Sequence, residues 1–200
     1  MRCSSWGLCI VAALVLPASA AHSATMTFIA GLSGANERPD PVSSPGTGLA
    51  IVVLDPTAET IHILATFSSL TSPTTAAHIH CCAPLNTNAG VATTVPAFIG
   101  FPLGVTFGAY MSPVFSLADA LIYNPAFITA QGGLRQAEAA LIAGIIAGQS
   151  YFNIHTVNFP GCEIRGQLAA VAQVPLPASV ILFVSALLGL GLLRGRKLVS

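Results

Sequence analysis

The sequence contains very little charge. Only 7% of its 200 residues are Asp, Glu, Lys or Arg, whereas an average soluble domain has about 25%. All seven acidic residues lie from Glu37 to Glu163, and residues 25–173 have only three basic residues: Arg38, Arg135 and Arg165. The middle of the chain is therefore mildly acidic and has no basic patch, so we expect no binding to nucleic acid.

Motifs of several enzyme classes are missing. The sequence has neither the Gly-x-Ser-x-Gly elbow of serine hydrolases nor a glycine-rich phosphate-binding loop of the Walker or dinucleotide type. Its scattered acidic residues indicate no pair of glycosidase carboxylates. They are Glu37, Asp40, Asp55, Glu59, Asp119, Glu138 and Glu163. We therefore expect a protein that is not an enzyme, with a metalloenzyme as the alternative.

Residues 1–24 have the three parts of a secretory signal peptide. Arg2 supplies the positive start, residues 8–16 are apolar, and Ala18-Ser19-Ala20 matches a cleavage site, with a second option at 22–24. The apolar run is too short to span a membrane. We therefore predict that this segment is cleaved and that the protein is exported.

The C-terminal segment, residues 174–200, has a different composition. A Pro-x-Pro break is followed by an uncharged stretch at 178–193 and then by a basic cluster. The break and the cluster consist of Val174, Pro175, Pro177, Arg194, Arg196 and Lys197. As a helix the stretch is about 24 Å long, slightly short of the hydrocarbon core. We predict a transmembrane helix at 178–193 with the basic residues on the cytoplasmic side.

This three-part order resembles the PEP-CTERM sorting signal of Gram-negative bacteria. The resemblance implies processing by an exosortase-type enzyme and removal of the helix. The protein would stay in the inner membrane only transiently and would then reach the cell surface or the extracellular biofilm matrix. A plain membrane anchor that keeps its helix is the alternative.

Residues 25–173 remain as one domain. Hydrophobic patterning predicts strands at 27–33, 48–54, 60–67, 76–80, 91–99, 151–157 and 163–171. One inserted α-helix is predicted at about 134–147, ended by Gly148, whereas 101–133 contains several prolines and is expected to be irregular. Short, regularly spaced strands favour a mostly β fold, an antiparallel β-sandwich or barrel.

Four sequence blocks occur in a characteristic order. They are LSGANERP at 32–39, AHIH at 77–80, YFNIHT at 151–156 and PGCEIRGQL at 160–168. Their order and spacing over about residues 28–170 resemble the CHRD domain, the module named from chordin. The resemblance implies a mostly β extracellular module and names no activity. We expect a structural or binding module that contacts an extracellular protein or polysaccharide.

Three histidines of this domain are candidate metal ligands. His78 and His80 are two residues apart on a predicted strand, so their side chains point to the same face, and His155 lies on the polar face of another strand. Neutral imidazole is a common ligand of zinc and copper. The leading expectation is a domain without a cofactor, and a copper or zinc site is the alternative. In the structural interpretation, Glu163 and Arg165 would hydrogen-bond to the histidines.

Three cysteines remain once the signal peptide is removed: Cys81, Cys82 and Cys162. Export permits disulfides, and three thiols allow one bond and one free thiol. Strand parity favours a bond between Cys81 and Cys162, because Cys81 shares the face of Ile79. A bond between the adjacent Cys81 and Cys82 is the alternative.

Overall fold

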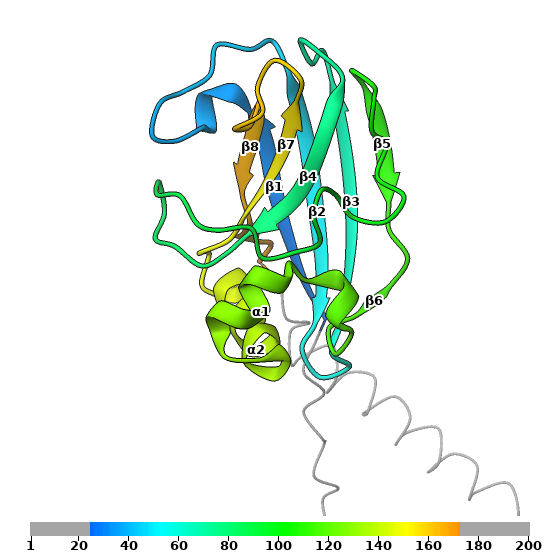
Figure 1. Ribbon diagram of the computed structural model, residues 1–200, viewed down its shortest axis with the longest axis vertical. Helices are drawn as coiled ribbons and strands as arrows, with labels where there is room; N and C mark the ends of the chain where they lie inside the picture. The colour runs from blue at the N-terminus through cyan, green and yellow to red at the C-terminus, as the bar shows by residue number, and fades with distance from the viewer. Residues whose placement is uncertain (1–24, 173–200) are drawn as a thin grey trace, which may run out of the picture.

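The computed structural model describes residues 25–172. In this part of the chain, nine strands form one antiparallel sheet in the order β4-β7-β8-β1-β2-β3-β5, while β6 also pairs with β3 and β9 with β1. The sheet curls into a half-barrel, and two helices lie at one end of it (Figure 1). The prediction of a mostly β, antiparallel fold is confirmed.

The elements have the following bounds. The strands are β1 (Met26–Ser33), β2 (Thr47–Asp55), β3 (Thr60–Ser68), β4 (Thr74–His80), β5 (Gly108–Met111), β6 (Phe115–Ser116), β7 (Tyr151–Thr156), β8 (Ile164–Gln167) and β9 (Ala169–Ala170). The helices are α1 (Pro125–Gln131) and α2 (Leu134–Ile146), with single 3₁₀ turns at Gly34–Asn36 and Ala120–Ile122.

Alternation of apolar and polar residues explains the central strands. On β3 the side chains of Ile61, Ile63, Ala65 and Phe67 are buried, while the residues between them are half-buried or exposed, because successive side chains point to opposite faces of a sheet. The strands predicted at 27–33, 48–54, 60–67, 76–80 and 151–157 are confirmed to within two residues. The strand predicted at 163–171 is divided into β8 and β9.

The sheet does not close into a barrel, and no second sheet packs on it within the described chain. Its two end strands are β4 and β5. Helical and loop residues complete the core on the open side: Ala92, Phe98, Phe101, Ile122, Tyr123, Phe127, Ala137, Leu141 and Ile145. The curled sheet therefore needs no partner sheet to bury its inner face.

The prediction of a strand at 91–99 is wrong. This segment makes only isolated bridges, between Val91 and His80, Thr93 and Tyr123, and Ala97 and Ala77. Pro96 interrupts it, and proline has no N–H to donate to a strand ladder.

The prediction of a single helix is also wrong, because α1 precedes α2. The side chain of Asn124 accepts a hydrogen bond from the Ala126 N–H, and Pro125 occupies the first helical position. Proline is favoured there because its missing N–H has no partner inside the helix. A left-handed Gly132, with a φ of 88°, ends α1. Pro125 therefore starts a helix in a region that its prolines predict to be irregular.

The two ends of the described domain lie side by side. Phe28 of β1 pairs with Ala170 of β9, and the Val171 N–H donates to the Thr27 carbonyl at 2.8 Å. The helices lie at the same end of the sheet (Figure 1). Within residues 25–172, no helix is long and apolar enough to cross a membrane. The predicted signal peptide at 1–24, with its helix, and the predicted sorting segment at 174–200, with its helix at 178–193, lie outside the described residues.

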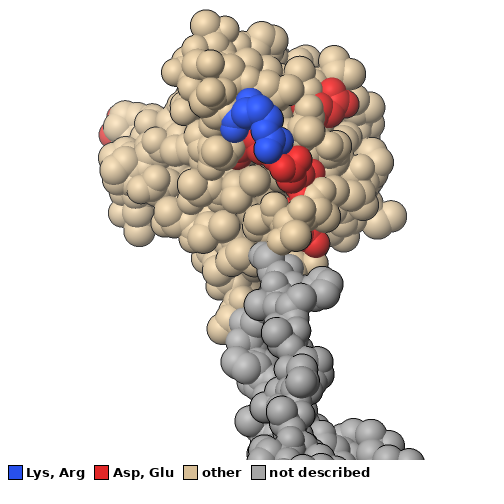
Figure 2. All heavy atoms as spheres, turned by 90° about the horizontal axis from the view of Figure 1, so that it is seen from below, with Lys and Arg blue, Asp and Glu red and all other residues tan. Residues whose placement is uncertain are grey.

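The surface at this end carries a few charged groups, and most of them are acidic (Figure 2). Seen from this end, a basic group lies directly against acidic groups and most of the surface is uncharged (Figure 2). Arg135 of α2 bridges Glu59 at 3.1 Å and Glu138 at 2.7 Å. Glu138 is only 3% exposed.

Candidate metal centre

Polar side chains line the outer face of β4, β7 and β8. The core-facing residues of these strands include Ile79, Phe152, Ile154 and Ile164, so the residues between them point away from the core. Strand register aligns the outward residues in two rows. One row is His80, Tyr151 and Gln167, and the other is His78, Asn153 and Arg165.

Two loops cover this outer face. The carbonyl of Ala89, in the loop after β4, lies 2.8 Å from His80 Nδ1, and the carbonyl of Pro160, in the loop after β7, lies 2.9 Å from His155 Nδ1. As a result His78, His80 and His155 are only 5%, 9% and 8% exposed. The outer face of β4, β7 and β8 is therefore a second buried layer, and it is polar.

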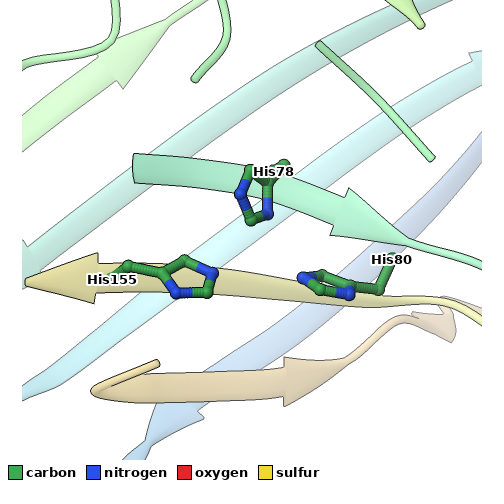
Figure 3. Close-up of side chains that lie close together, drawn as sticks. All are labelled: His78, His80 and His155. Carbon is green, nitrogen blue, oxygen red and sulfur yellow. The ribbon is translucent and has the colours of Figure 1, made fainter. Parts of the chain in front are cut away.

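The three histidines predicted as metal ligands lie together (Figure 3). The ring centroids of His78 and His155 are 4.7 Å apart, those of His78 and His80 are 5.0 Å apart, and those of His80 and His155 are 6.2 Å apart. One ring nitrogen of each residue lies within 4.8 Å of the corresponding atoms of the other two. The β4–β7 pairing thus brings together residues separated by 75 positions in the sequence.

Hydrogen bonds orient two of the three rings. A carbonyl oxygen only accepts, so His80 and His155 each carry a proton on Nδ1, which leaves a lone pair on Nε2. Both Nε2 atoms are buried and have no hydrogen-bond partner in the described domain. Metal-bound histidines typically show this same pattern, with the second ring nitrogen donating to a carbonyl or carboxylate.

Buried polar atoms without a partner are concentrated at this place. Within residues 25–172, six buried side-chain nitrogen or oxygen atoms lack a hydrogen bond, and four of them belong to His78, His80, Asn153 and His155. Each such atom costs about 1–3 kcal/mol of folding free energy, and native proteins contain few of them. A ligand that accepts these lone pairs would remove this cost.

Burial keeps the three imidazoles neutral. Burial, with the neighbouring charges of His155 and His80, lowers the pKa of His78 to about 3. Burial also lowers the pKa of His80 to about 4, although its hydrogen bond to Ala89 acts in the opposite direction, and burial lowers the pKa of His155. Near neutral pH, all three rings are therefore in the form that binds a metal ion.

Glu163 and Arg165 are not partners of the histidines in the described domain. The Glu163 carboxylate is fully buried and accepts hydrogen bonds from Ser44, Thr71 and Thr156. The Arg165 guanidinium donates to Asn88 and Thr87, at 2.7 Å each. The structural interpretation based on these two partners is therefore wrong.

Tyr151 and Arg165 instead stack beside His80. The Tyr151 ring lies parallel to the His80 ring, with centroids 4.6 Å apart and planes at 11°. The Arg165 guanidinium carbon lies 3.4 Å from the Tyr151 ring centroid, a cation–π contact. The Tyr151 hydroxyl also accepts from the Ala89 N–H at 3.0 Å. Ala89 and Tyr151 together fix the position of the His80 ring, and neither contact could be predicted from the sequence.

The disulfide joins Cys81 and Cys82, directly after His80. It packs on α2, where a Cβ added at Gly144 would overlap both sulfur atoms. Within the described chain Cys162 is a free, buried thiol, and its sulfur lies 3.1 Å from the Ile164 carbonyl. The bond between Cys81 and Cys162 that strand parity favoured is not formed, because the Cys81 side chain is directed to the helix.

Comparison with protein families assigns the domain. The family model of the CHRD domain matches residues 28–168, a range that includes β8, the loops over the histidines and all three histidines. No curated protein and no solved structure matches the chain. CHRD domains are typical of secreted and extracellular proteins, which agrees with the predicted export. The chain belongs to the CHRD domain family.

Proposed function

We propose that this chain is an exported CHRD-family protein that binds one copper or zinc ion through His78, His80 and His155. One observation carries the proposal: three buried, neutral imidazoles place nitrogen atoms within 4.8 Å of one another, and a ring nitrogen of each has no partner among the described residues. Imidazole nitrogen suits both zinc and copper, and three histidines form known zinc sites.

The surroundings support metal binding without catalysis. The three histidines are at most 9% exposed, and the loop carbonyls of Ala89 and Pro160 cover the site. A catalytic metal site keeps a position open to substrate, whereas this site is covered. We therefore assign the ion a role in storage or in stabilising the domain, and we propose no enzymatic activity.

The terminal segments supply the proposed location. The signal peptide motif supports export, and the PEP-CTERM-like segment supports processing by an exosortase-type enzyme at the inner membrane. The released domain would then act at the cell surface or in the biofilm matrix of a Gram-negative bacterium, on a protein or polysaccharide partner and not on nucleic acid. The position of both domain ends at one end of the sheet would leave the opposite end available to a partner.

Elemental analysis tests the metal assignment. The full chain, purified without an affinity tag, is expected to contain one copper or zinc ion or to bind one with high affinity. His78→Ala and His155→Ala are expected to lose it. His62→Ala is the matched control, because His62 lies on β3 outside the cluster. A metal-free protein that binds neither Cu(II) nor Zn(II) would exclude the proposal.

Intact-mass spectrometry under non-reducing conditions tests the location. We expect a chain cut after Ala20 or Ala24 and again near Pro177, with two hydrogens fewer than the reduced mass because of the disulfide. A mass that includes the helix at 178–193 would instead indicate a membrane-anchored protein. Recovery of the processed chain from biofilm matrix would support a matrix role, and a pull-down from that material would identify the partner.

A further inference from the structure

Asn153 occupies the middle of the histidine cluster. On β7 it lies two residues before His155, so both side chains point to the same face of the strand. In the pairing with β4 it lies directly opposite His78, and opposite residues of an antiparallel pair are close neighbours. The Asn153 side chain is 3% exposed, so its amide is shielded from bulk solvent.

The amide oxygen of Asn153 has no hydrogen-bond partner in the described domain. The residue opposite it on β8 is Arg165, but that guanidinium donates to the loop residues Asn88 and Thr87. The Tyr151 hydroxyl, two residues along the strand, is bonded to Ala89. The Arg165 guanidinium and the Tyr151 hydroxyl are therefore bonded to loop residues and not to the Asn153 oxygen.

Three imidazole nitrogens leave one position of a tetrahedral metal ion unfilled. An amide oxygen can occupy such a position, and copper sites in particular accept a weak neutral oxygen ligand beside their nitrogen ligands. Strand register puts Asn153 on the same face as the three histidines, and its oxygen, like a nitrogen of each histidine, has no partner in the described domain. One ion within reach of all four groups would satisfy them. The shared lack of partners distinguishes Asn153 from a buried amide that only packs in the core.

We propose that the Asn153 amide oxygen is the fourth ligand of the metal ion, an inference that rests on the proposed metal binding. It gives the site three nitrogens and one oxygen, all from neutral side chains on β4 and β7. Since the Asn153 oxygen would then have no partner except the ion, its burial would lower the folding stability of the metal-free protein. Affinity and metal-free stability are therefore expected to respond in opposite directions when the amide is removed.

The test uses the full chain, with Cu(II) as the probe and two substitutions of similar size. Asn153→Leu removes the oxygen, and we expect at least a tenfold loss of Cu(II) affinity, an altered Cu(II) hyperfine splitting in the EPR spectrum, and a higher melting temperature of the metal-free protein. Asn153→Asp keeps the oxygen and adds charge, so it is expected to bind Cu(II) more tightly than the wild type. It also remains informative if Asn153→Leu fails to fold.

Ser150→Ala is the matched control, because Ser150 also carries a buried, partnerless oxygen in the described domain but lies before β7, outside the cluster. It is expected to leave Cu(II) affinity and the EPR spectrum unchanged. If Asn153→Leu and Asn153→Asp bind Cu(II) like the wild type with the same spectrum, Asn153 is not a ligand. A wild-type chain that binds no Cu(II) or Zn(II) would refute the metal site itself, which is a different result.

Discussion

Acidification is expected to destabilise the metal-free protein, because the folded state keeps its buried histidines neutral while the unfolded state lets them bind protons. The pKa of His78 is lowered to about 3 and that of His80 to about 4, from the usual value of 6.5. At a pH between the lowered pKa values and 6.5, the histidines of the unfolded chain bind protons that those of the folded chain do not bind. Stability is therefore complete above pH 6.5 and falls as the pH drops toward the lowered pKa values.

The magnitude follows from the size of the shifts. Each pKa unit corresponds to about 1.4 kcal/mol, so going from pH 7.5 to 5.5 costs about 1.4 kcal/mol for each of these two histidines. Together they account for about 3 kcal/mol, and His155, whose pKa burial also lowers, acts in the same direction. This loss is a large fraction of the 5–15 kcal/mol that typically stabilises a domain.

Urea unfolding in the presence of a chelator, at pH 7.5 and 5.5, measures this loss. His78→Gln keeps a neutral polar side chain and is expected to reduce the pH-dependent loss by about 1.4 kcal/mol, whatever its effect at pH 7.5. His62→Gln serves as the control outside the cluster. An equal loss in the wild type and in His78→Gln would refute the argument that buried, neutral histidines cause it.

Three further predictions concern the rest of the domain. Gly144→Ala places a methyl group against the disulfide and is expected to cost about 1–3 kcal/mol of unfolding free energy, whereas Ala143→Gly, its neighbour, would lack this clash. Arg135→Ala leaves the buried Glu138 carboxylate without its 2.7 Å partner and is expected to lower the unfolding free energy more than Glu59→Ala, which removes only an exposed pair. Asn124→Ala removes the α1 cap and is expected to cost about 1 kcal/mol. Thermal or urea unfolding measures all three, and equal stability of Arg135→Ala and Glu59→Ala would contradict the role of burial.

The strands of the fold could be predicted from local patterns, because side-chain alternation is a property of the sequence itself. The segment at 91–99 shows the limit of such patterns. It is apolar enough for a strand, but Pro96 and its position over the core prevent a ladder. For α1 the signal was present as Asn124 followed by Pro125, and it was assigned to irregular structure because proline both breaks and starts helices.

The candidate site could be predicted only in part. Strand parity puts His78 and His80 on one face, and this was visible in the sequence. Their meeting with His155 depends on the register of β4 against β7, which long-range pairing determines. The carbonyls of Ala89 and Pro160, which set the ring tautomers, come from loops whose paths the sequence does not reveal. The disulfide pairing was open for the same reason, since it depends on which way Cys81 faces.

Strand β7 has all six of its residues buried, because one face packs in the apolar core and the other in the polar layer. A shift of its pairing by one residue would exchange the two faces and would put Asn153 and His155 among isoleucines. A one-residue shift would therefore disrupt the apolar core and the polar layer together, so the two layers favour the same strand register. If the proposed ion binds there, its retention would indicate correct strand pairing, and we expect substitutions in the core beneath β7 to weaken metal binding without changing any proposed ligand.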